Sequence, residues 1–178
     1  MTGIAIDFAA LETAFESHAP GVRAFLNRTS GALETLDAAA RSLPSADWLE
    51  VEPVPSREQY RMMERFIETV THGPLKERLQ DAIVGKGAFR RFKDVVTRFP
   101  EERKRWFSFR DVLLHRHILE WLKTHRVAVE EMPAWNIDLP ITPGPDSGRE
   151  LGVGEEEIPA LDEKVELEEL RSFLLSWA

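Results

Sequence analysis

The sequence contains no cysteine among its 178 residues. Disulfide bonds, thiolate metal sites and cysteine nucleophiles are therefore excluded, and the absence suits a reducing cytoplasm. No apolar run approaches the length of a membrane-spanning helix. The first residues lack a basic segment and reach an acid at Asp7, so we expect no signal peptide. These absences indicate a cytoplasmic protein without disulfides and without a membrane span.

The charge is unevenly distributed along the chain. The formal net charge is −8, yet residues 57–126 carry 17 Lys and Arg against 10 Asp and Glu. Residues 1–56 carry 3 against 8, and residues 127–178 carry 3 against 13. A negative net charge argues against a nucleic-acid partner. The excess of cations in residues 57–126, however, is compatible with such a partner.

The N-terminal third combines one helical pattern with three strand patterns. Asp7 can cap a short helix that ends near Ser17. A Ser30-Gly31 turn joins two short β-prone runs into a hairpin, and a third such run follows. The three expected strands cover residues 22–27, 32–36 and 48–52. This region predicts a helix beside a small antiparallel β-sheet.

From Ser56 the apolar residues recur every three or four positions, which predicts helices. Ser56 and Gln59 form a capping-box signature at the first helix start. Ser108, with Asp111 three residues later, predicts that a new helix begins there and runs to about His125. Other boundaries are expected at Gly73, Gly85, Gly87 and Pro100. Residues 1–129 therefore predict one α+β domain, in which the N-terminal helix and sheet pack with a bundle of four to five helices.

The C-terminal part changes character. Residues 130–160 contain five prolines and four glycines, which predicts a Pro/Gly-rich acidic linker. Residues 161–178 return to helical spacing and predict an amphipathic helix. Its apolar residues could dock on the helical block, on a second copy of the chain or on another protein. The anchors are Leu170, Phe173, Leu174 and Trp177.

The most distinctive stretch is Gly85–Asp94, with two glycines, two phenylalanines and four cations in ten residues. Gly85 is expected to end one helix with a positive φ, and Gly87 lets the next begin almost at once. On a helical wheel one arc is apolar and the remainder is mostly cationic. The apolar arc holds Ala88, Phe89, Phe92, Val95, Val96 and Phe99, so Gly85, Phe89 and Phe92 are expected to be structural.

The cations of this stretch have two interpretations. The first backbone amides of a helix favour an anion, so they could hold a phosphate together with Lys86 and Arg90. The stretch could instead be a tight helical corner with a solvated basic face, which Asp94 partly neutralises. The candidate residues for binding an anion or a partner are Lys86, Gly87, Arg90, Arg91, Lys93 and Arg98.

Other chemistry finds little support. Gly85-x-Gly87-x-x-Arg90 lacks the third glycine of a dinucleotide fingerprint, and Gly85-Lys86-Gly87 lacks the Ser or Thr of a P-loop. His115 and His117 are two residues apart, so on a helix they do not face one metal site. We expect no catalytic residue, no metal and no cofactor.

The chain resembles a bacterial family of unknown activity, uncharacterised protein family 0158. The resemblance spans roughly residues 7–129 and implies no reaction, ligand or catalytic residue. It rests on Phe25-Leu26-Asn27-Arg28-Thr29-x-Gly31, on Tyr60-x-x-Met63-x-x-Phe66, on Gly85–Asp94, and on Trp106-x-x-Phe109 with Trp121-Leu122.

We expect a non-enzymatic binding protein of the bacterial cytoplasm. Its basic surface, Gly85–Arg110, would engage nucleic acid, phosphate or an acidic protein. One alternative is an enzyme for a phosphate-bearing small molecule, anchored by Lys86, Arg90 and Arg91. Another is a protein–protein adaptor that uses the C-terminal helix. A deep pocket beside the Gly85–Arg91 corner would favour the enzyme, and an open positive face would favour nucleic acid.

Overall fold

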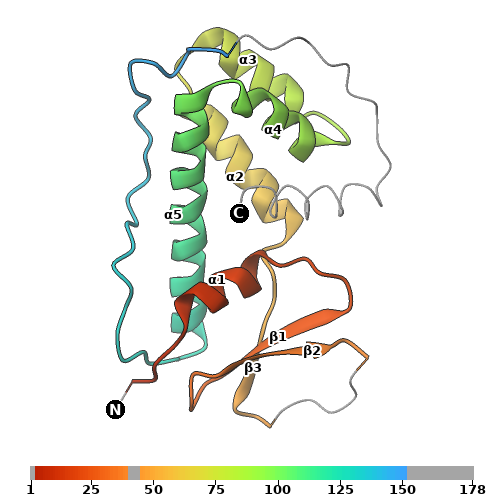
Figure 1. Ribbon diagram of the computed structural model, residues 1–178, viewed down its shortest axis with the longest axis vertical. Coiled ribbons are helices and arrows are strands. Elements are labelled where there is room, and N and C mark those ends of the chain that lie inside the picture. Colours follow the sequence, from red (N-terminus) through yellow and green to blue (C-terminus); the bar gives the residue numbers. More distant parts are fainter. Residues whose placement is uncertain (1–2, 40–44, 152–178) are drawn as a thin grey trace. The chain divides into compact units, whose positions relative to one another are not determined.

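The structure, a computed structural model, describes residues 3–39 and 45–151. The chain forms two compact units (Figure 1). Unit 1 contains residues up to Val54 together with Leu114–Ile137. Unit 2 contains Pro55–Leu113 and, within the described chain, residues 138–151. The longest helix contributes its first part to unit 2 and its last part to unit 1.

Unit 1 begins with helix α1, Phe8–Glu16, and Asp7 caps it by accepting a hydrogen bond from the Ala10 amide at 3.0 Å. Three strands follow, β1 (Val22–Asn27), β2 (Leu33–Asp37) and β3 (Trp48–Val51). They form one antiparallel sheet in the order β2-β1-β3. The predicted helix, hairpin and third strand are confirmed, and with them the α+β class.

The hairpin is fixed by its turn and by its central strand. The Asn27 side chain accepts hydrogen bonds from the amides of Thr29 and Ser30, each at 2.9 Å, so it shapes the turn directly. Leu26 of β1 pairs with Leu33 on one side and Leu49 on the other. Because paired residues of antiparallel strands point to the same face, these leucines form an apolar row. Leu26 at its centre is fully buried.

Unit 2 is built around aromatic rings from its helices. These are α2 (Ser56–Glu68), α3 (Gly73–Ala82), α4 (Ala88–Thr97) and the first part of α5 (Pro100–Thr124). Phe66 of α2 makes edge-on contacts with Phe92 of α4 and with Trp106 and Phe109 of α5. Burial of these rings is the main stabilising term for the unit. Among the described residues, unit 2 thus has four helices, within the predicted range.

Two predicted helix boundaries are wrong. Ser56 is the first residue of α2, and the cap position belongs to Pro55, whose ring has no side-chain acceptor. The capping box between Ser56 and Gln59 therefore does not form. The same helix ends at Glu68, several residues before Gly73, where the Thr69 hydroxyl donates to the Phe66 carbonyl at 2.6 Å.

Ser108 does not begin a helix, because α5 is continuous for 25 residues from Pro100 to Thr124. Ser108 is exposed, and a serine in that setting is tolerated in a helix interior when tertiary contacts hold the flanking turns. Those contacts come from Trp106, Phe109 and Leu113, which are all buried in the core of unit 2. Buried side chains on both sides of Ser108 therefore keep the helix continuous, although the local sequence has the pattern of a cap.

None of the described helices is long and apolar enough to cross a lipid bilayer. The predicted C-terminal helix, residues 161–178, lies outside the described residues. The division into a domain at 1–129 and a linker at 130–160 stays a prediction.

Candidate functional site

The Gly85–Asp94 stretch forms a tight corner between α3 and α4 (Figure 1). Gly85 and Gly87 both have φ of 75°, in the left-handed region that side chains disfavour. The prediction of a positive φ at Gly85 is confirmed. The predicted apolar arc is also confirmed, because Phe89, Phe92 and Val96 are buried in the core of unit 2. The corner is therefore set by backbone geometry and by core packing.

Gly85→Val should lower the free energy of unfolding by about 1–3 kcal/mol, because a β-branched residue is strained at this φ. Apart from the two adjacent residues, no atom of the described chain lies within 4 Å of a Cβ built on Gly85, so the loss would report backbone strain alone. The matched control, Lys86→Ala, removes an exposed side chain and should change stability by less than about 0.5 kcal/mol. Urea denaturation of both variants measures the difference. Equal, small losses of unfolding free energy in the two variants would contradict the interpretation that Gly85 occupies a conformation that side chains disfavour.

The Arg91 side chain holds the carbonyl groups of this corner. Its Nε donates to the Ala82 carbonyl at 2.9 Å, Nη2 donates to the Val84 carbonyl at 2.5 Å, and Nη1 donates to the Lys86 carbonyl. These carbonyls lie at and beyond the C-terminal end of α3, where helical partners are missing and the helix dipole is negative. A planar cation with several donors suits that position. Arg91 thus has a structural role that the sequence did not reveal.

Tyr60 completes the same set of contacts. Its hydroxyl donates to the Ile83 carbonyl at 2.8 Å. Burial raises the pKa of the Tyr60 hydroxyl, and so does the charge of Glu64, so the hydroxyl keeps its proton and remains a donor at neutral pH. Two side chains from different helices therefore bind the carbonyls of Ala82, Ile83, Val84 and Lys86.

The other predicted cations lie along α4 and at its two ends. Lys86 and Arg90 are exposed, whereas Lys93 and Arg98 are half-buried. Asp94 approaches Arg90 only loosely, with 4.0 Å between Arg90 Nε and an Asp94 oxygen. The predicted neutralisation by Asp94 is therefore weak at this pair, since exposed ion pairs contribute little. A phosphate bound by Lys86, Arg90 and the Gly87 backbone stays a prediction.

A second group of cations lies on α5, within the predicted basic surface Gly85–Arg110 but outside the list of candidate binding residues. Arg103 and Arg110 each place their guanidinium carbon over the ring of Phe107, at 5.5 and 5.7 Å from its centre. These residues are spaced at four and then three positions, so they share one face of a continuous helix. The predicted break at Ser108 concealed that spacing, because it assigned Arg103 and Arg110 to different helices.

The helices that carry the two groups contact each other in unit 2. The ring of Phe92 on α4 contacts that of Trp106 on α5, with centres 4.8 Å apart. Arg103, Phe107 and Arg110 occupy the flank of α5 next to Trp106, since each residue advances about 100° around a helix. We call the combined set the cationic surface. It consists of Lys86, Arg90, Lys93 and Arg98 on α4 and its ends, and Arg103, Phe107 and Arg110 on α5.

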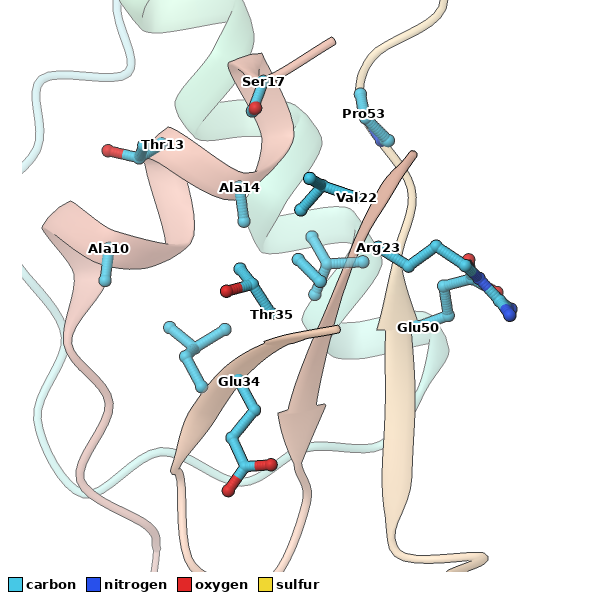
Figure 2. A pocket seen from close by; sticks show the side chains of 13 residues that line it. Ala10, Thr13, Ala14, Ser17, Val22, Arg23, Glu34, Thr35, Glu50 and Pro53 are labelled. Atoms are coloured by element: carbon cyan, nitrogen blue, oxygen red, sulfur yellow. Dashed lines mark hydrogen bonds and ion pairs between the residues drawn. The ribbon is translucent and has the colours of Figure 1, made fainter. Parts of the chain in front are cut away.

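Unit 1 contains a hollow of about 550 Å³ between α1 and the sheet (Figure 2). Most of its walls are small or apolar, with Ala10 and Ala14 from α1 and Val22 and Thr35 from the strands. None of the residues that line it belongs to the Gly85–Arg91 corner. The hollow is therefore not the pocket that would have supported a phosphate-handling enzyme at the corner.

The rim of this hollow carries a charged pair. Arg23 donates two hydrogen bonds to Glu50, at 2.7 and 2.6 Å, and Figure 2 shows both side chains at one edge of the sheet. The hydrogen bonds from Arg23 hold the pKa of Glu50 below its ordinary value, so Glu50 is ionised at neutral pH. Because each charge satisfies the other, this pair offers no unmatched charge to a ligand.

The histidines of α5 make separate contacts in unit 1, as expected from their spacing. His115 Nε2 lies 2.5 Å from a Glu12 oxygen, and the His115 ring stacks on Trp135 with centres 4.0 Å apart. His117 instead contacts Phe15 edge-on. No group of three or more possible metal ligands occurs in the described part of the chain. Both histidines are thus used in packing contacts.

Comparison with known proteins points to one family. The model of a family described as "Uncharacterised protein family (UPF0158)" matches residues 6–142. The UPF0158 protein PA5073 of Pseudomonas aeruginosa is 23% identical over 125 residues, which are 65% of this chain and 81% of that protein. No solved structure matches the chain. The cationic surface and the walls of the hollow both fall within the residues that the family model matches.

Proposed function

Because the chain belongs to the uncharacterised protein family UPF0158, whose description names no activity, we propose a function from the site itself. The protein binds nucleic acid through its phosphates, and the cationic surface of unit 2 makes the contacts. Binding of this kind depends on backbone charge and does not require a particular base sequence.

The arrangement of Arg103, Phe107 and Arg110 is the observation that carries this proposal. A guanidinium group is flat and presents parallel N–H donors that match two phosphate oxygens. Stacking on the Phe107 ring restrains both guanidinium groups. Restrained side chains lose less conformational entropy when a ligand binds. Arg103 is exposed, so its N–H donors suit phosphate oxygens, whereas the Arg110 side chain is only 13% exposed and pairs with Asp111 at 3.7 Å.

The edge of α4 extends the same charge pattern. Lys86 and Arg90 are exposed, and Lys93 lies between them and the Arg98 end of the helix. Successive phosphates of a nucleic acid could therefore meet cations from two helices. Several contacts of modest strength give a binding free energy that depends steeply on salt, because each neutralised phosphate releases counterions.

Catalysis is less well supported than binding. Arg91, one of three anchors expected in a phosphate-handling enzyme, donates to three backbone carbonyls of the corner. The hollow in unit 1 is lined by residues between Ala10 and Pro53, none of which is in the cationic surface. These placements favour an open binding surface over an enclosed reaction site.

Neutralising three exposed cations of the surface tests the proposal. We expect Lys86→Gln, Arg90→Gln and Arg103→Gln together to weaken binding of labelled single-stranded RNA at low salt by about tenfold or more. The slope of log K against log salt should fall by about 2, since each lost phosphate contact removes roughly 0.7 from it. Fluorescence anisotropy over a range of salt concentrations measures both. Parallel titrations with single-stranded and duplex DNA determine whether the strand type matters.

Unit 2 also offers a matched control. Arg57, Arg61 and Arg65 are exposed on α2 and recur at four-residue spacing, so they form a row of equal charge on a different helix. Their replacement by glutamine removes the same net charge and should weaken binding by less than about threefold, through long-range electrostatics alone. Equal losses for both triple variants, or no binding by the unmodified protein at any salt concentration, would refute the proposal.

A further inference from the structure

Residues 138–151 have little regular secondary structure, yet they lie against the helices of unit 2. Leu139 packs on the aromatic core, and the Pro140 carbonyl accepts a hydrogen bond from Arg105 at 3.2 Å. A Cβ built on Gly148 would lie 2.4 Å from the His72 ring, so the backbone is in close contact there. This segment therefore has a defined course over unit 2.

The segment ends at the cationic surface. Glu150 forms an ion pair with Arg78 at 2.8 Å. One residue later, the Leu151 amide donates to the Arg98 carbonyl at 2.6 Å. Arg98 is the C-cap residue of α4 and a member of the cationic surface. The rest of the chain therefore starts from the end of the helix whose exposed edge carries Lys93 and Arg90.

The sequence beyond this point, residues 152–178, is strongly acidic, and we call it the acidic tail. It contains eight Asp and Glu residues against two Lys and Arg, and Glu155-Glu156-Glu157 comes first. Its 27 residues could extend over about 90 Å at roughly 3.3 Å per residue. The ten residues of α4 span only about 15 Å at 1.5 Å per residue. Both the charge and the length of the tail fit the adjacent surface.

We propose that residues 155–169 of the acidic tail occupy the cationic surface of the same molecule and compete there with nucleic acid. The competition rests on the proposed function, whereas the docking itself does not. The tail carries several carboxylates close together in sequence, as a nucleic acid carries phosphates. Tethering at Leu151 gives these carboxylates an effective concentration on the order of millimolar, so weak individual ion pairs suffice.

An apolar contact is available at the edge of this surface. Val84 is 70% exposed and lies in the corner two residues before Lys86. The tail follows its acidic residues with Leu170, Phe173, Leu174 and Trp177. Contact of one of these with Val84 would remove apolar surface from water and add to the electrostatic attraction. The acidic part of the tail remains the part that determines where it docks.

The absence of cysteine permits a direct test of docking in the full chain. A spin label on Ala160→Cys would be the protein's single thiol adduct. We expect it to broaden the amide signals of Arg90, Lys93 and Arg103 at low salt. At 1 M salt the Debye length falls to about 3 Å, and the broadening should largely disappear. Broadening absent from α4 and α5, or unchanged by salt, would overturn the proposal.

Two controls identify the cause and the molecule involved. Replacing Glu155, Glu156, Glu157 and Glu163 by Gln, with Asp162→Asn, keeps the length of the tail and should abolish the broadening. Persistent broadening in that variant would show that charge does not direct the docking. A mixture of spin-labelled unenriched protein with unlabelled isotope-enriched protein detects contacts between copies. Broadening in the mixture equal to that in the enriched labelled protein would overturn docking within one molecule.

RNA-binding affinity measures the competition between the acidic tail and nucleic acid. The charge-neutralised tail variant should bind single-stranded RNA at least about tenfold more tightly than the unmodified chain at low salt, and the two should converge at high salt. If the label reports docking but neither protein binds RNA or DNA, the proposed function fails while the docking stands. If both proteins bind RNA equally and the label reports no docking, the inference fails while the proposed function stands.

Discussion

Replacing Arg105 by leucine is expected to lower the free energy of unfolding by about 3–5 kcal/mol. Arg105 binds both carboxylate oxygens of Glu102, at 3.1 and 2.6 Å, and the Glu102 side chain is only 1% exposed. Removing the arginine would leave that carboxylate buried without its cation. The guanidinium also lies over the Phe66 ring at 4.5 Å and bonds to the Thr69 hydroxyl, so further contacts would be lost. Urea denaturation measures the loss, and amide exchange locates it in unit 2.

Lys104 provides the matched control for this variant. It is adjacent to Arg105 in the same helix, but its side chain is 76% exposed and, among the described residues, pairs with the exposed Glu101. Lys104→Leu should change stability by less than about 1 kcal/mol. Glu102→Leu combined with Arg105→Leu should recover much of the loss, because no unpaired charge remains in the interior. Similar losses for the Arg105 and Lys104 single variants would show that the buried pair is not the cause.

Arg91→Ala should lower the free energy of unfolding by about 2 kcal/mol. Hydrogen bonds from a charged donor contribute roughly 1.5–3 kcal/mol when buried, and water can replace part of that at the half-buried Arg91. The variant leaves the carbonyls of Ala82, Val84 and Lys86 without this side-chain donor. The loss should appear in amide exchange around the end of α3.

The neighbouring residue tests whether the effect is structural. Arg90→Ala removes a cation of the same type from an exposed position and should change stability by no more than about 0.5 kcal/mol. Arg91→Lys keeps the charge but cannot reach three carbonyls with one planar group, so it should recover less than half of the loss. Full recovery of the free energy of unfolding in Arg91→Lys would contradict the role assigned to the planar guanidinium group.

The local features of the chain could be predicted from sequence because their causes are local. Asp7 caps the helix that follows it, and the apolar arc of α4 is buried as its spacing indicates. The positive φ of Gly85 follows from the same reasoning. The hairpin turn depends on Asn27 and its immediate neighbours. In each case residues within a few positions of one another provide both the signal and the contact.

Features that depend on distant contacts were not predictable in the same way. A helical wheel places Arg91 among the solvated cations, yet its side chain reaches back nine residues to Ala82. Ser108 has the local pattern of a cap, but the buried stripe of Trp106 and Phe109 continues the helix through it. The position of β3 beside β1 depends on the pairing of Leu49 with Leu26. Spacing within one segment contains no information about those partners.

The candidate site was predicted in part for the same reason. The cations of α4 were found because they lie within one short motif, and Lys86 and Arg90 are exposed as expected. Arg103 and Arg110 lie within the predicted basic surface, but the face that they share with Phe107 was missed because the predicted boundary at Ser108 placed Arg110 in a separate helix. A continuous 3.6-residue pattern through Trp106, Phe109 and Leu113 was the available signal for an unbroken α5.

Unit 1 has a discontinuous chain, and this affects the order in which the protein can fold during synthesis. Ile4 bridges to Val129, with hydrogen bonds of 2.9 Å from the Ile4 amide to Ala128 and from the Glu130 amide to Ile4. At roughly 5–20 residues per second, a ribosome needs about 4–15 s to make the chain between Val54 and Val129. During that interval Phe15 lacks its partner Trp121. The newly made N-terminal region therefore exposes core surface during that interval, as folding intermediates that bind chaperones or aggregate do.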